Sequence, residues 1–403
     1  MAEARQWLLG SALLLALAFG RAAAAEKIYD PGASDSEIKI GQTMPYSGPL
    51  SSASVMAKVE LAYFRRLNKQ GGINGRRIAL ISLDDGYSPP KTVEQTRRLV
   101  EQEEVLAMMG SFGSSTNAAV QKYLTARKVP QLFLLAGSSR WNDPAHFPWT
   151  MALVPPIRNE GKAHASYVLR RNPTARIAVL YQDDDYGRDY LEGVKERFGP
   201  EAAQRIAATA SYLPTDPTVD SQIITLEASG ADTLFLAATP KFTAQALRKA
   251  FDLGWHPLRF ITLVSTSVGG VLEPAGLERT AGVMSAATFK SVSDPQWQGD
   301  LEYRDWLAFM HEDYPEGDVS DQLAVNGYAY AALFAEILRR CGDDLTRAHL
   351  MEVATHLDAV HLPMLLPGIS VNTSPTDFNP LKQIRLQRFD GREWRLLENF
   401  VEQ

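Results

Sequence analysis

Residues 37–83 read EIKIGQTMPYSGPLSSASVMAKVELAYFRRLNKQGGINGRRIALISL, and this stretch predicts the architecture of the chain. Residues 37–40 alternate polar and apolar side chains, and residues 78–83 form a short apolar run; both patterns are typical of strands. Between them, apolar residues recur at helical spacing, at Met56, Val59, Tyr63 and Leu67. Gly71 and Gly72 are a stop signal for that helix. The stretch is therefore a strand–helix–strand unit.

The same alternation continues along the chain. Residues 105–109 and 131–135 read as further strands with a helix between them. The pattern restarts with the apolar runs 176–181, 233–237 and 259–263. Strands that alternate with helices are typical of α/β domains with parallel sheets. We therefore expect an α/β fold with two doubly wound parallel-sheet lobes, for which 403 residues are enough.

Two stretches indicate where the chain passes between the lobes. Residues 151–158 (MALVPPIR) contain two prolines, and residues 368–380 (GISVNTSPTDFNP) are rich in turn formers. After the second stretch, residues 383–397 read as two strands around Asp390 and Gly391, a dipeptide that favours a hairpin.

The first 25 residues differ from the rest of the chain. The apolar run at residues 7–20 has the length of a signal-peptide core and is short for a membrane span. The alanines before Glu26 fit the small-residue rule for cleavage. We expect residues 1–25 to be a signal peptide, cleaved near Ala25/Glu26. An uncleaved membrane anchor is the alternative, and Arg21 at the end of the apolar run disfavours it.

The chain has one cysteine, Cys341, so it has no intrachain disulfide. Cys341 also lies far from the leader, so no lipid-modified cysteine follows the cleavage position. No later segment has 18 or so continuous apolar residues, and we expect the mature protein not to be membrane-inserted. A secreted, untethered protein needs a compartment that retains it, and a bacterial periplasm fits.

Composition and motifs disfavour nucleic-acid binding and catalysis. The net charge is -6 and no basic block occurs, so we expect no nucleic-acid partner. The seven histidines show no metal-binding spacing, and the chain lacks GxSxG, GxxxxGK[ST] and GxGxxG motifs. We expect no metal, no cofactor and no enzymatic activity.

Small hydroxyl side chains follow two neighbouring strands of the first unit. Residues 110–117 read GSFGSSTN, and residues 136–139 read AGSS. Ligands of open parallel sheets bind at the carboxyl ends of strands, where backbone N–H groups and a helix dipole favour an anion. These loops are candidates for holding a carboxylate without a counter-charge. Simple capping of the following helices is the alternative.

Several motifs resemble a known family. They are SGP at 47–49, GGINGR at 71–76, GSFGSSTNAAVQKYL at 110–124 and LYQDDDYGRDYLEGVKERF at 180–198. In combination they resemble the periplasmic binding proteins for branched-chain amino acids and related solutes, from about residue 37 to the C-terminus.

The resemblance implies a type I periplasmic-binding fold with three crossings between lobes. The first lobe would contain residues 33–153 plus 288–368, and the second residues 154–287 plus 369–403. The family also implies a receptor of an ATP-driven importer, usually monomeric, whose partners are an ABC permease and its ATPase subunits.

The resemblance also implies where the ligand sits. The carboxylate would be held by Ser114 with Ser115 and by Ser138 with Ser139. Tyr186, in the DYG motif of the second lobe, would close over it. The loop after the first strand, with Tyr46 and Ser47, would contribute.

One loop departs from the amino-acid binders of this family. They carry an acidic residue there for the ligand ammonium, whereas residues 237–242 read AATPKF and include Thr239 and Phe242 but no acid. An unpaired buried ammonium costs several kcal/mol. Tyr87, Phe242 and the other tyrosines suit apolar or stacking walls. We therefore favour an aliphatic or aromatic carboxylic acid, while Asp185 keeps an amino-acid ligand open.

A sensor is the alternative from another class. The same clamp can feed a membrane receptor instead of a permease, and the sequence motifs do not separate these two uses.

Overall fold

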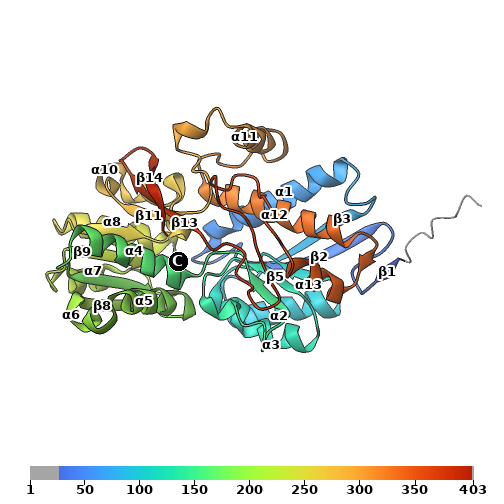
Figure 1. Ribbon diagram of the computed structural model, residues 1–403, viewed down its shortest axis with the longest axis horizontal. Coiled ribbons are helices and arrows are strands. Elements are labelled where there is room, and N and C mark those ends of the chain that lie inside the picture. Colours follow the sequence, from blue (N-terminus) through green and yellow to red (C-terminus); the bar gives the residue numbers. More distant parts are fainter. Residues whose placement is uncertain (1–26, 402–403) are drawn as a thin grey trace, which may run out of the picture.

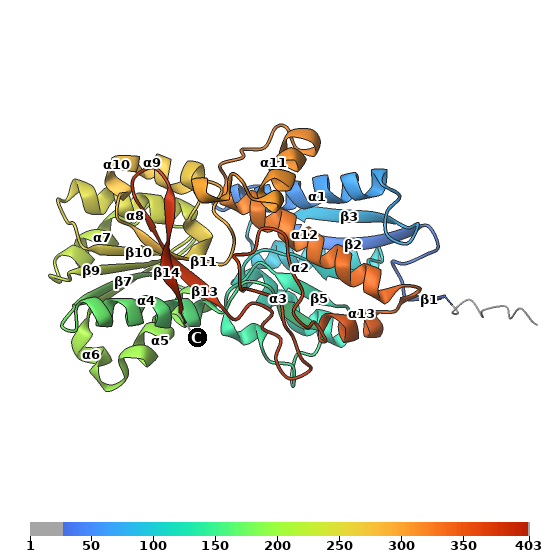
Figure 2. The same cartoon turned by 45° about the horizontal axis from the view of Figure 1, so that its top comes forward.

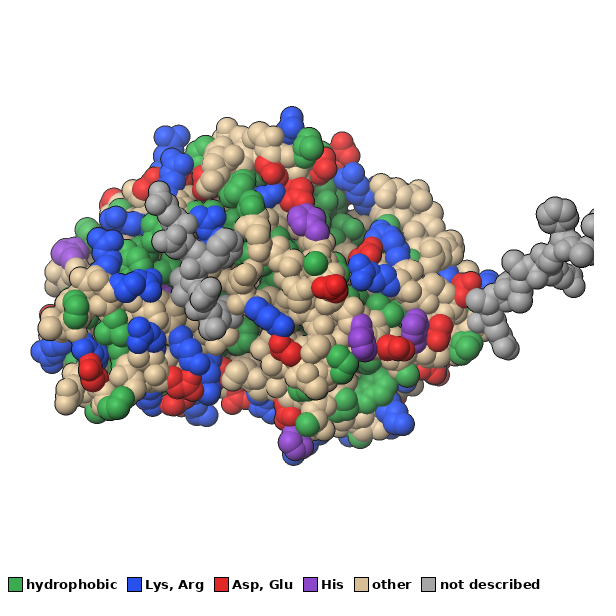
Figure 3. All heavy atoms as spheres, viewed as in Figure 1, with side chains coloured by type: hydrophobic (Ala, Val, Ile, Leu, Met, Phe, Trp, Pro, Cys, Tyr) green, Lys and Arg blue, Asp and Glu red, His purple; other side chains and the backbone are tan. Residues whose placement is uncertain are grey.

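The computed structural model describes residues 27–401, so the expected signal peptide (1–25) and its cleavage near Ala25/Glu26 lie outside the described residues. Two lobes lie side by side, each with helices on both faces of a central sheet (Figures 1 and 2). On the face in Figure 3, basic and acidic side chains are interspersed.

The first lobe is built on five parallel strands in the order β3-β2-β4-β5-β6. The order changes direction between β2 and β4, and the crevice at the carboxyl ends of such strands is where open α/β sheets bind ligands. The strands are β2 (Glu37–Met44), β3 (Arg77–Asp84), β4 (Ala107–Met109), β5 (Gln131–Leu134) and β6 (Thr150–Ala152).

The helices of the first lobe bury apolar faces against this sheet and each other. On α1, Met56, Val59 and Leu67 are buried, as their helical spacing predicts, and α1 lies beside α12 in both views (Figures 1 and 2). The helices are α1 (Ser54–Lys69), α2 (Pro89–Glu101), α3 (Ser114–Ala126), α11 (Leu301–Asp313), α12 (Gln322–Cys341) and α13 (Arg347–Ala354).

The second lobe has a seven-stranded sheet in the order β14-β13-β11-β10-β9-β7-β8. It is parallel except for β13 and β14, which form an antiparallel hairpin around Asp390 and Gly391, as predicted. The strands are β7 (Ile177–Gln182), β8 (Ile206–Tyr212), β9 (Thr233–Ala237), β10 (Leu258–Ile261), β11 (Met284–Ala287), β13 (Ile384–Phe389) and β14 (Trp394–Val401).

The helices of the second lobe flank this sheet. They are α4 (Ile157–Arg171), α5 (Asp185–Phe198), α6 (Ala202–Arg205), α7 (Asp220–Glu227), α8 (Pro240–Asp252), α9 (Glu273–Ala275) and α10 (Leu277–Thr280). Single-turn segments connect elements in both lobes: η1 (Ser51–Ala53), η2 (Ser139–Trp141), η3 (Gly199–Glu201), η4 (Leu263–Ser265), η5 (Val268–Leu272) and η6 (Pro295–Trp297).

The chain passes between the two sheets between β6 and α4, after β11, and before β13. The third passage, before β13, differs from the expectation. The sequence analysis assigned all of residues 369–403 to the second lobe. Residues 369–381 instead pack on the first lobe, because Ile369, Val371, Phe378 and Leu381 are buried in its core. That passage therefore begins after Leu381.

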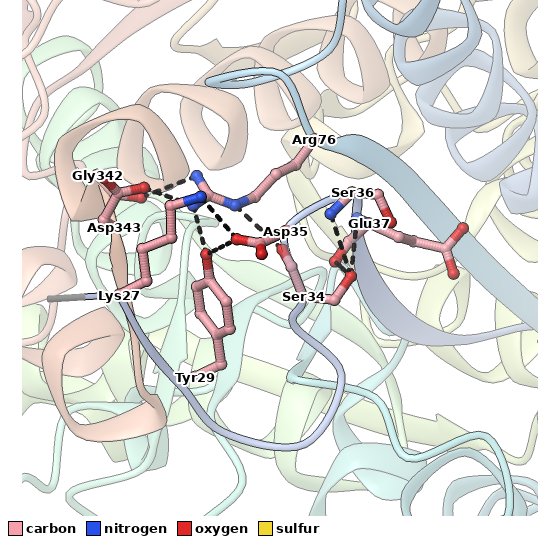
Figure 4. A network of polar contacts seen from close by, with 9 residues as sticks. All are labelled: Lys27, Tyr29, Ser34, Asp35, Ser36, Glu37, Arg76, Gly342 and Asp343. Carbon is pink, nitrogen blue, oxygen red and sulfur yellow. Dashed lines mark hydrogen bonds and ion pairs between the residues drawn. The ribbon is translucent and has the colours of Figure 1, made fainter.

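The buried side chain of Arg76, from the GGINGR motif, ties the N-terminal segment to the far end of α12 (Figure 4). Its Nη2 donates to the Tyr29 hydroxyl at 2.7 Å and pairs with Asp343, while its Nε donates to the Ser34 carbonyl at 3.1 Å. The short strand β1 (Ile28–Tyr29) pairs there with β12 (Asp344–Leu345). The motif requires glycine at Gly72, where φ is 71° and a Cβ would lie 2.1 Å from the Arg76 carbonyl oxygen.

Candidate functional site

A cavity with an empty volume of about 660 Å³, open to solvent, lies between the lobes at the carboxyl ends of the parallel strands. The first lobe contributes the loops after β3, β4 and β5 and one face of α12. The second lobe contributes the segments after β7, β9 and β10. Both lobes therefore have to be in place to enclose a ligand.

The walls of this cavity are uncharged and mainly apolar. No Asp, Glu, Lys, Arg or His is among the described residues that line it. An ammonium group placed here would have no carboxylate partner in the wall, and desolvating an unpaired charge is costly. The apolar wall residues are Ala53, Met56, Phe112, Leu135, Ala136, Val154, Pro240, Leu263, Val264 and Leu323.

Ser114, the first residue of α3, lines the cavity as predicted from sequence. Its side chain is 2% exposed, and its Oγ has no hydrogen-bond partner within residues 27–401. The first N–H groups of a helix also lack partners inside the helix, and the helix dipole favours negative charge at this end. The amino end of α3 thus offers an unused hydroxyl and backbone donors, the donor set that suits a carboxylate.

Tyr87 and Gln182 meet across the boundary between the lobes. Gln182 is the last residue of β7 in the second lobe, and its Nε2 donates to the Tyr87 hydroxyl at 3.2 Å. Burial raises the pKa of Tyr87 well above its ordinary value of 10.0, so its hydroxyl stays protonated and remains a donor. This predicted wall residue therefore presents an apolar ring with a polar tip.

Two predicted residues of the second lobe also line the cavity. Tyr186 shares a hydrogen bond of 2.6 Å with Thr262, and burial raises its pKa well above 10.0. The hydroxyls of Thr239 and Tyr212 are 3.2 Å apart. These phenols and hydroxyls are neutral, so this side of the cavity can offer hydrogen bonds but no charge.

The structure places the predicted residues of the first loop outside the cavity lining. The Tyr46 hydroxyl donates to Ser82 at 2.8 Å, and the Ser47 hydroxyl donates to Asp84 at 2.7 Å. Ser115, next to Ser114 on α3, also lies outside the lining and interacts instead with the Tyr87 hydroxyl. These side chains hold the loops that carry the cavity wall.

The second hydroxyl loop makes structural contacts as well. The Ser138 Oγ accepts from the backbone N–H of Arg140 at 3.4 Å, which caps η2. Ser139 donates through its N–H and its hydroxyl to Asp189 of the second lobe, at 2.7 and 2.9 Å. Asp189 also accepts from Arg158 at 2.7 Å. Ser139 thus joins the two lobes beside the cavity and does not line it.

Phe242 is not a cavity wall, contrary to the expectation. It is fully buried on the inner face of α8, in the core of the second lobe, and its ring centroid lies 4.3 Å from that of Tyr212. Lys241 lies outside the cavity with its Nζ 4.6 Å from the Phe242 ring centroid. Asp185, the possible substitute acid, pairs with Arg140 and is also outside the lining.

Sequence reasoning missed one face of α12. Leu323, Asn326 and Tyr330 recur at helical spacing and line the cavity from the first lobe. Apolar residues at this spacing are equally typical of core packing, so the sequence alone does not mark them as a cavity wall.

Within the described residues, no three His, Cys, Asp or Glu side chains come together as metal ligands. Searched over the same residues, the chain has no helix with the length and apolar character needed to cross a bilayer.

The family model described as "Periplasmic binding protein" matches residues 37–393. The chain belongs to the periplasmic binding protein family. This confirms the family that the motifs at 71–76 and 110–124 indicated.

Among curated relatives of this periplasmic binding protein is the Leu/Ile/Val-binding protein homolog 7 of Brucella abortus (strain 2308). It is 26% identical over 250 residues, which cover 59% of this chain and 60% of the relative. The chain thus spans about 60% of the length of that relative.

Two solved structures show the same fold. A branched-chain amino acid ABC transporter protein from Thermus thermophilus, with bound valine, has a TM-score of 0.81 at 14% identity, covering 91% of this chain and 97% of its own. A fatty acid ABC transporter substrate-binding protein from Thermomonospora curvata has a TM-score of 0.77 at 20% identity, covering 94% and 95%. They confirm the expected α/β fold of two parallel-sheet lobes for this periplasmic binding protein.

Proposed function

We propose that this protein is the substrate-binding component of an ABC importer and captures a small, mainly apolar carboxylic acid between its lobes. The observation that carries the proposal is the uncharged cavity with an unpartnered, buried Ser114 hydroxyl at the amino end of α3. The carboxylate binds there, and the aliphatic or aromatic part of the ligand fills the apolar remainder. Tyr87, Tyr186 and Thr239 supply neutral polar contacts at its edge.

The environment of the two acids that directly precede Tyr186 supports a carboxylic-acid ligand over an amino acid. Asp184 caps α5 by accepting from the N–H groups of Tyr186 and Gly187, at 3.0 and 3.3 Å, and accepts from Gln182 at 2.7 Å. Asp185 is paired with Arg140. Neither carboxylate lines the cavity, so a ligand ammonium has no wall partner that would offset its desolvation.

An amino-acid ligand is the second candidate, and the names of the relatives favour it. The Brucella relative is named for Leu, Ile and Val binding, and the Thermus structure holds valine. The Thermomonospora structure is named for fatty acids, and it supports the first candidate.

A screen with matched ligand pairs separates the two candidates. Leucine and isocaproic acid, or phenylalanine and hydrocinnamic acid, differ by the ammonium group alone. Ligand binding raises the melting temperature by mass action, and titration calorimetry then gives the affinity. We expect the deaminated acid of at least one pair to bind at least about tenfold more tightly, a difference of ~1.4 kcal/mol. Tighter binding of the amino acid in both pairs contradicts the proposal.

The proposal includes a monomeric, non-enzymatic receptor in the periplasm that passes its ligand unchanged to a permease and its ATPase subunits. Ligand recovered chemically intact after long incubation, and protein found in the periplasmic fraction, are the expected results. A neighbouring sensor kinase gene in place of permease and ATPase genes would favour the sensor alternative.

A further inference from the structure

A second, small cavity lies next to the first, where the chain passes between the lobes. Leu263, Asn326 and Tyr330 line both cavities, so the two spaces are adjacent and these three side chains form their common wall. An elongated occupant of the first cavity would meet these three side chains before the second cavity.

The second cavity contains a buried hydrogen-bond acceptor without a partner. Gln387, on β13, is 4% exposed; its Nε2 donates to the Ala286 carbonyl at 3.2 Å. Its Oε1 has no hydrogen-bond partner within residues 27–401. A buried polar atom left in this state is destabilising, and a donor on an occupant would satisfy it.

Two other polar side chains of this cavity are already engaged. Gln322 donates through Nε2 to the Lys290 carbonyl and accepts through Oε1 from the Val292 N–H, both at 3.2 Å. The Thr266 hydroxyl donates to the Leu263 carbonyl at 3.0 Å. Gln387 differs from these two residues, because its Oε1 is buried without a partner among the described residues.

We propose that the second cavity receives the far end of an elongated ligand and that this end carries a hydroxyl or N–H group which donates to Gln387 Oε1. The inference rests on the proposed function, with the ligand carboxylate at Ser114. Asn326, which is 8% exposed in the common wall, lies beside the connecting chain of the ligand. Phe289 and Trp394 supply apolar surface next to the donor group.

The test compares unbranched monocarboxylic acids of increasing chain length with the ω-hydroxy acids of the same length, by titration calorimetry on the whole protein. For acids too short to reach Gln387, the hydroxyl enters apolar surroundings and weakens binding. At a sufficient length the ω-hydroxy acid binds at least as tightly as its parent. The dissociation constant of the ω-hydroxy acid divided by that of its parent acid is therefore above one for short chains. It falls to one or below at a particular chain length.

Gln387→Met keeps the size of the side chain and removes the acceptor. We expect it to weaken binding of the long ω-hydroxy acid about tenfold relative to the parent acid, a change of ~1.4 kcal/mol in selectivity. Gln322→Met is the matched control, since it alters the same cavity but removes an amide that is already engaged. It should leave the ratio unchanged, whatever it does to overall stability.

The outcomes separate this inference from the proposed function. If short acids bind but no chain length shows a reversal in the wild-type protein, the second cavity holds water only and the inference is wrong, while the proposed function stands. An unchanged ratio in Gln387→Met also overturns it. If no acid of either series binds, the proposed function fails and the inference falls with it.

Discussion

Ser114 is the residue on which the proposed site depends most directly, because its buried hydroxyl has no partner elsewhere in residues 27–401. Ser114→Ala is predicted to weaken carboxylate binding by ~1.5–3 kcal/mol, the range for a hydrogen bond to a charged group. The melting temperature of the unligated protein should stay the same or rise slightly, since an unsatisfied polar atom is removed. Titration calorimetry and thermal unfolding measure the two effects.

Ser138→Ala is the control for this change. It deletes the same hydroxyl from the neighbouring loop, where the side chain caps η2 outside the cavity. Equal losses of affinity in the two variants would show that the carboxylate does not bind at α3.

Glu60, on α1, is fully buried, and burial raises its pKa from an ordinary 4.5 to about 8. A folded-state pKa above the unfolded one means that the folded protein holds the extra proton between these values. The contribution of this bound proton to the free energy of unfolding is fully present below about pH 4.5 and is lost as pH rises toward about 8. The loss amounts to ~1.4 kcal/mol per unit of difference between the folded and unfolded pKa. Glu60→Gln is predicted to be as stable as the wild type near pH 5 and more stable near pH 8.

Urea unfolding at several pH values between these limits measures the difference. Glu160, whose pKa burial also raises to about 8, stays in the variant and preserves part of the slope. Parallel curves for the two proteins would contradict the prediction.

At the scale of elements, the turn that starts α3 fixes the site. Gly113 has φ of 98°, and a Cβ there would lie 2.3 Å from the Tyr87 ring and 2.7 Å from the Thr116 hydroxyl. Gly113→Ala is predicted to cost ~1–3 kcal/mol of stability and to displace Tyr87, so that ligand affinity falls as well. Gly75→Ala, at φ of 79° with nothing within 4 Å, should lose stability through the backbone alone and keep its affinity. Denaturant unfolding and calorimetry compare the two variants, and an unaltered affinity in Gly113→Ala would argue against this role of the turn.

The elements that sequence predicted are those with a strong apolar period. The strands β7 and β9 and the hairpin of β13 and β14 were all foreseen. Among the strands that were missed are β8, which reads IAATASY with mostly half-buried side chains, and β11, which reads MSAA. Their small side chains carry little periodic signal, and the neighbouring strands of the sheet fix their conformation instead.

The site shows the same limit. Strand-end position brought Ser114 to the cavity lining, and the family resemblance brought Tyr186 there. The expected wall and the second-lobe loop supplied Tyr87 and Thr239. The same reasoning failed for Phe242, because a position in the first turn of a helix does not say which way the side chain turns. The sequence argument also missed the face of α12 that lines the cavity. The packing of both lobes places this face at the cleft.

At the scale of the whole molecule, the lobes are joined across the cleft by contacts that need no ligand. Asp189 of α5 accepts both donors of Ser139 from the first lobe, and Arg140 pairs with Asp185. Such contacts bias the equilibrium between open and closed arrangements toward the closed one, and apparent affinity scales with the closed fraction.

Asp189→Ala removes the larger of these connections, so the unligated protein is predicted to populate the open arrangement more. Its radius of gyration in small-angle scattering should increase, and its affinity for the acid should fall about tenfold (~1.4 kcal/mol) although no cavity residue has changed. Saturating ligand should restore the wild-type radius. Glu196→Ala, on the same helix, is the control, because Glu196 pairs with Arg158 and Lys162 inside the second lobe only. If both variants scatter and bind alike, the Ser139–Asp189 contact does not govern closure, and the cavity walls themselves must hold the lobes together around the ligand.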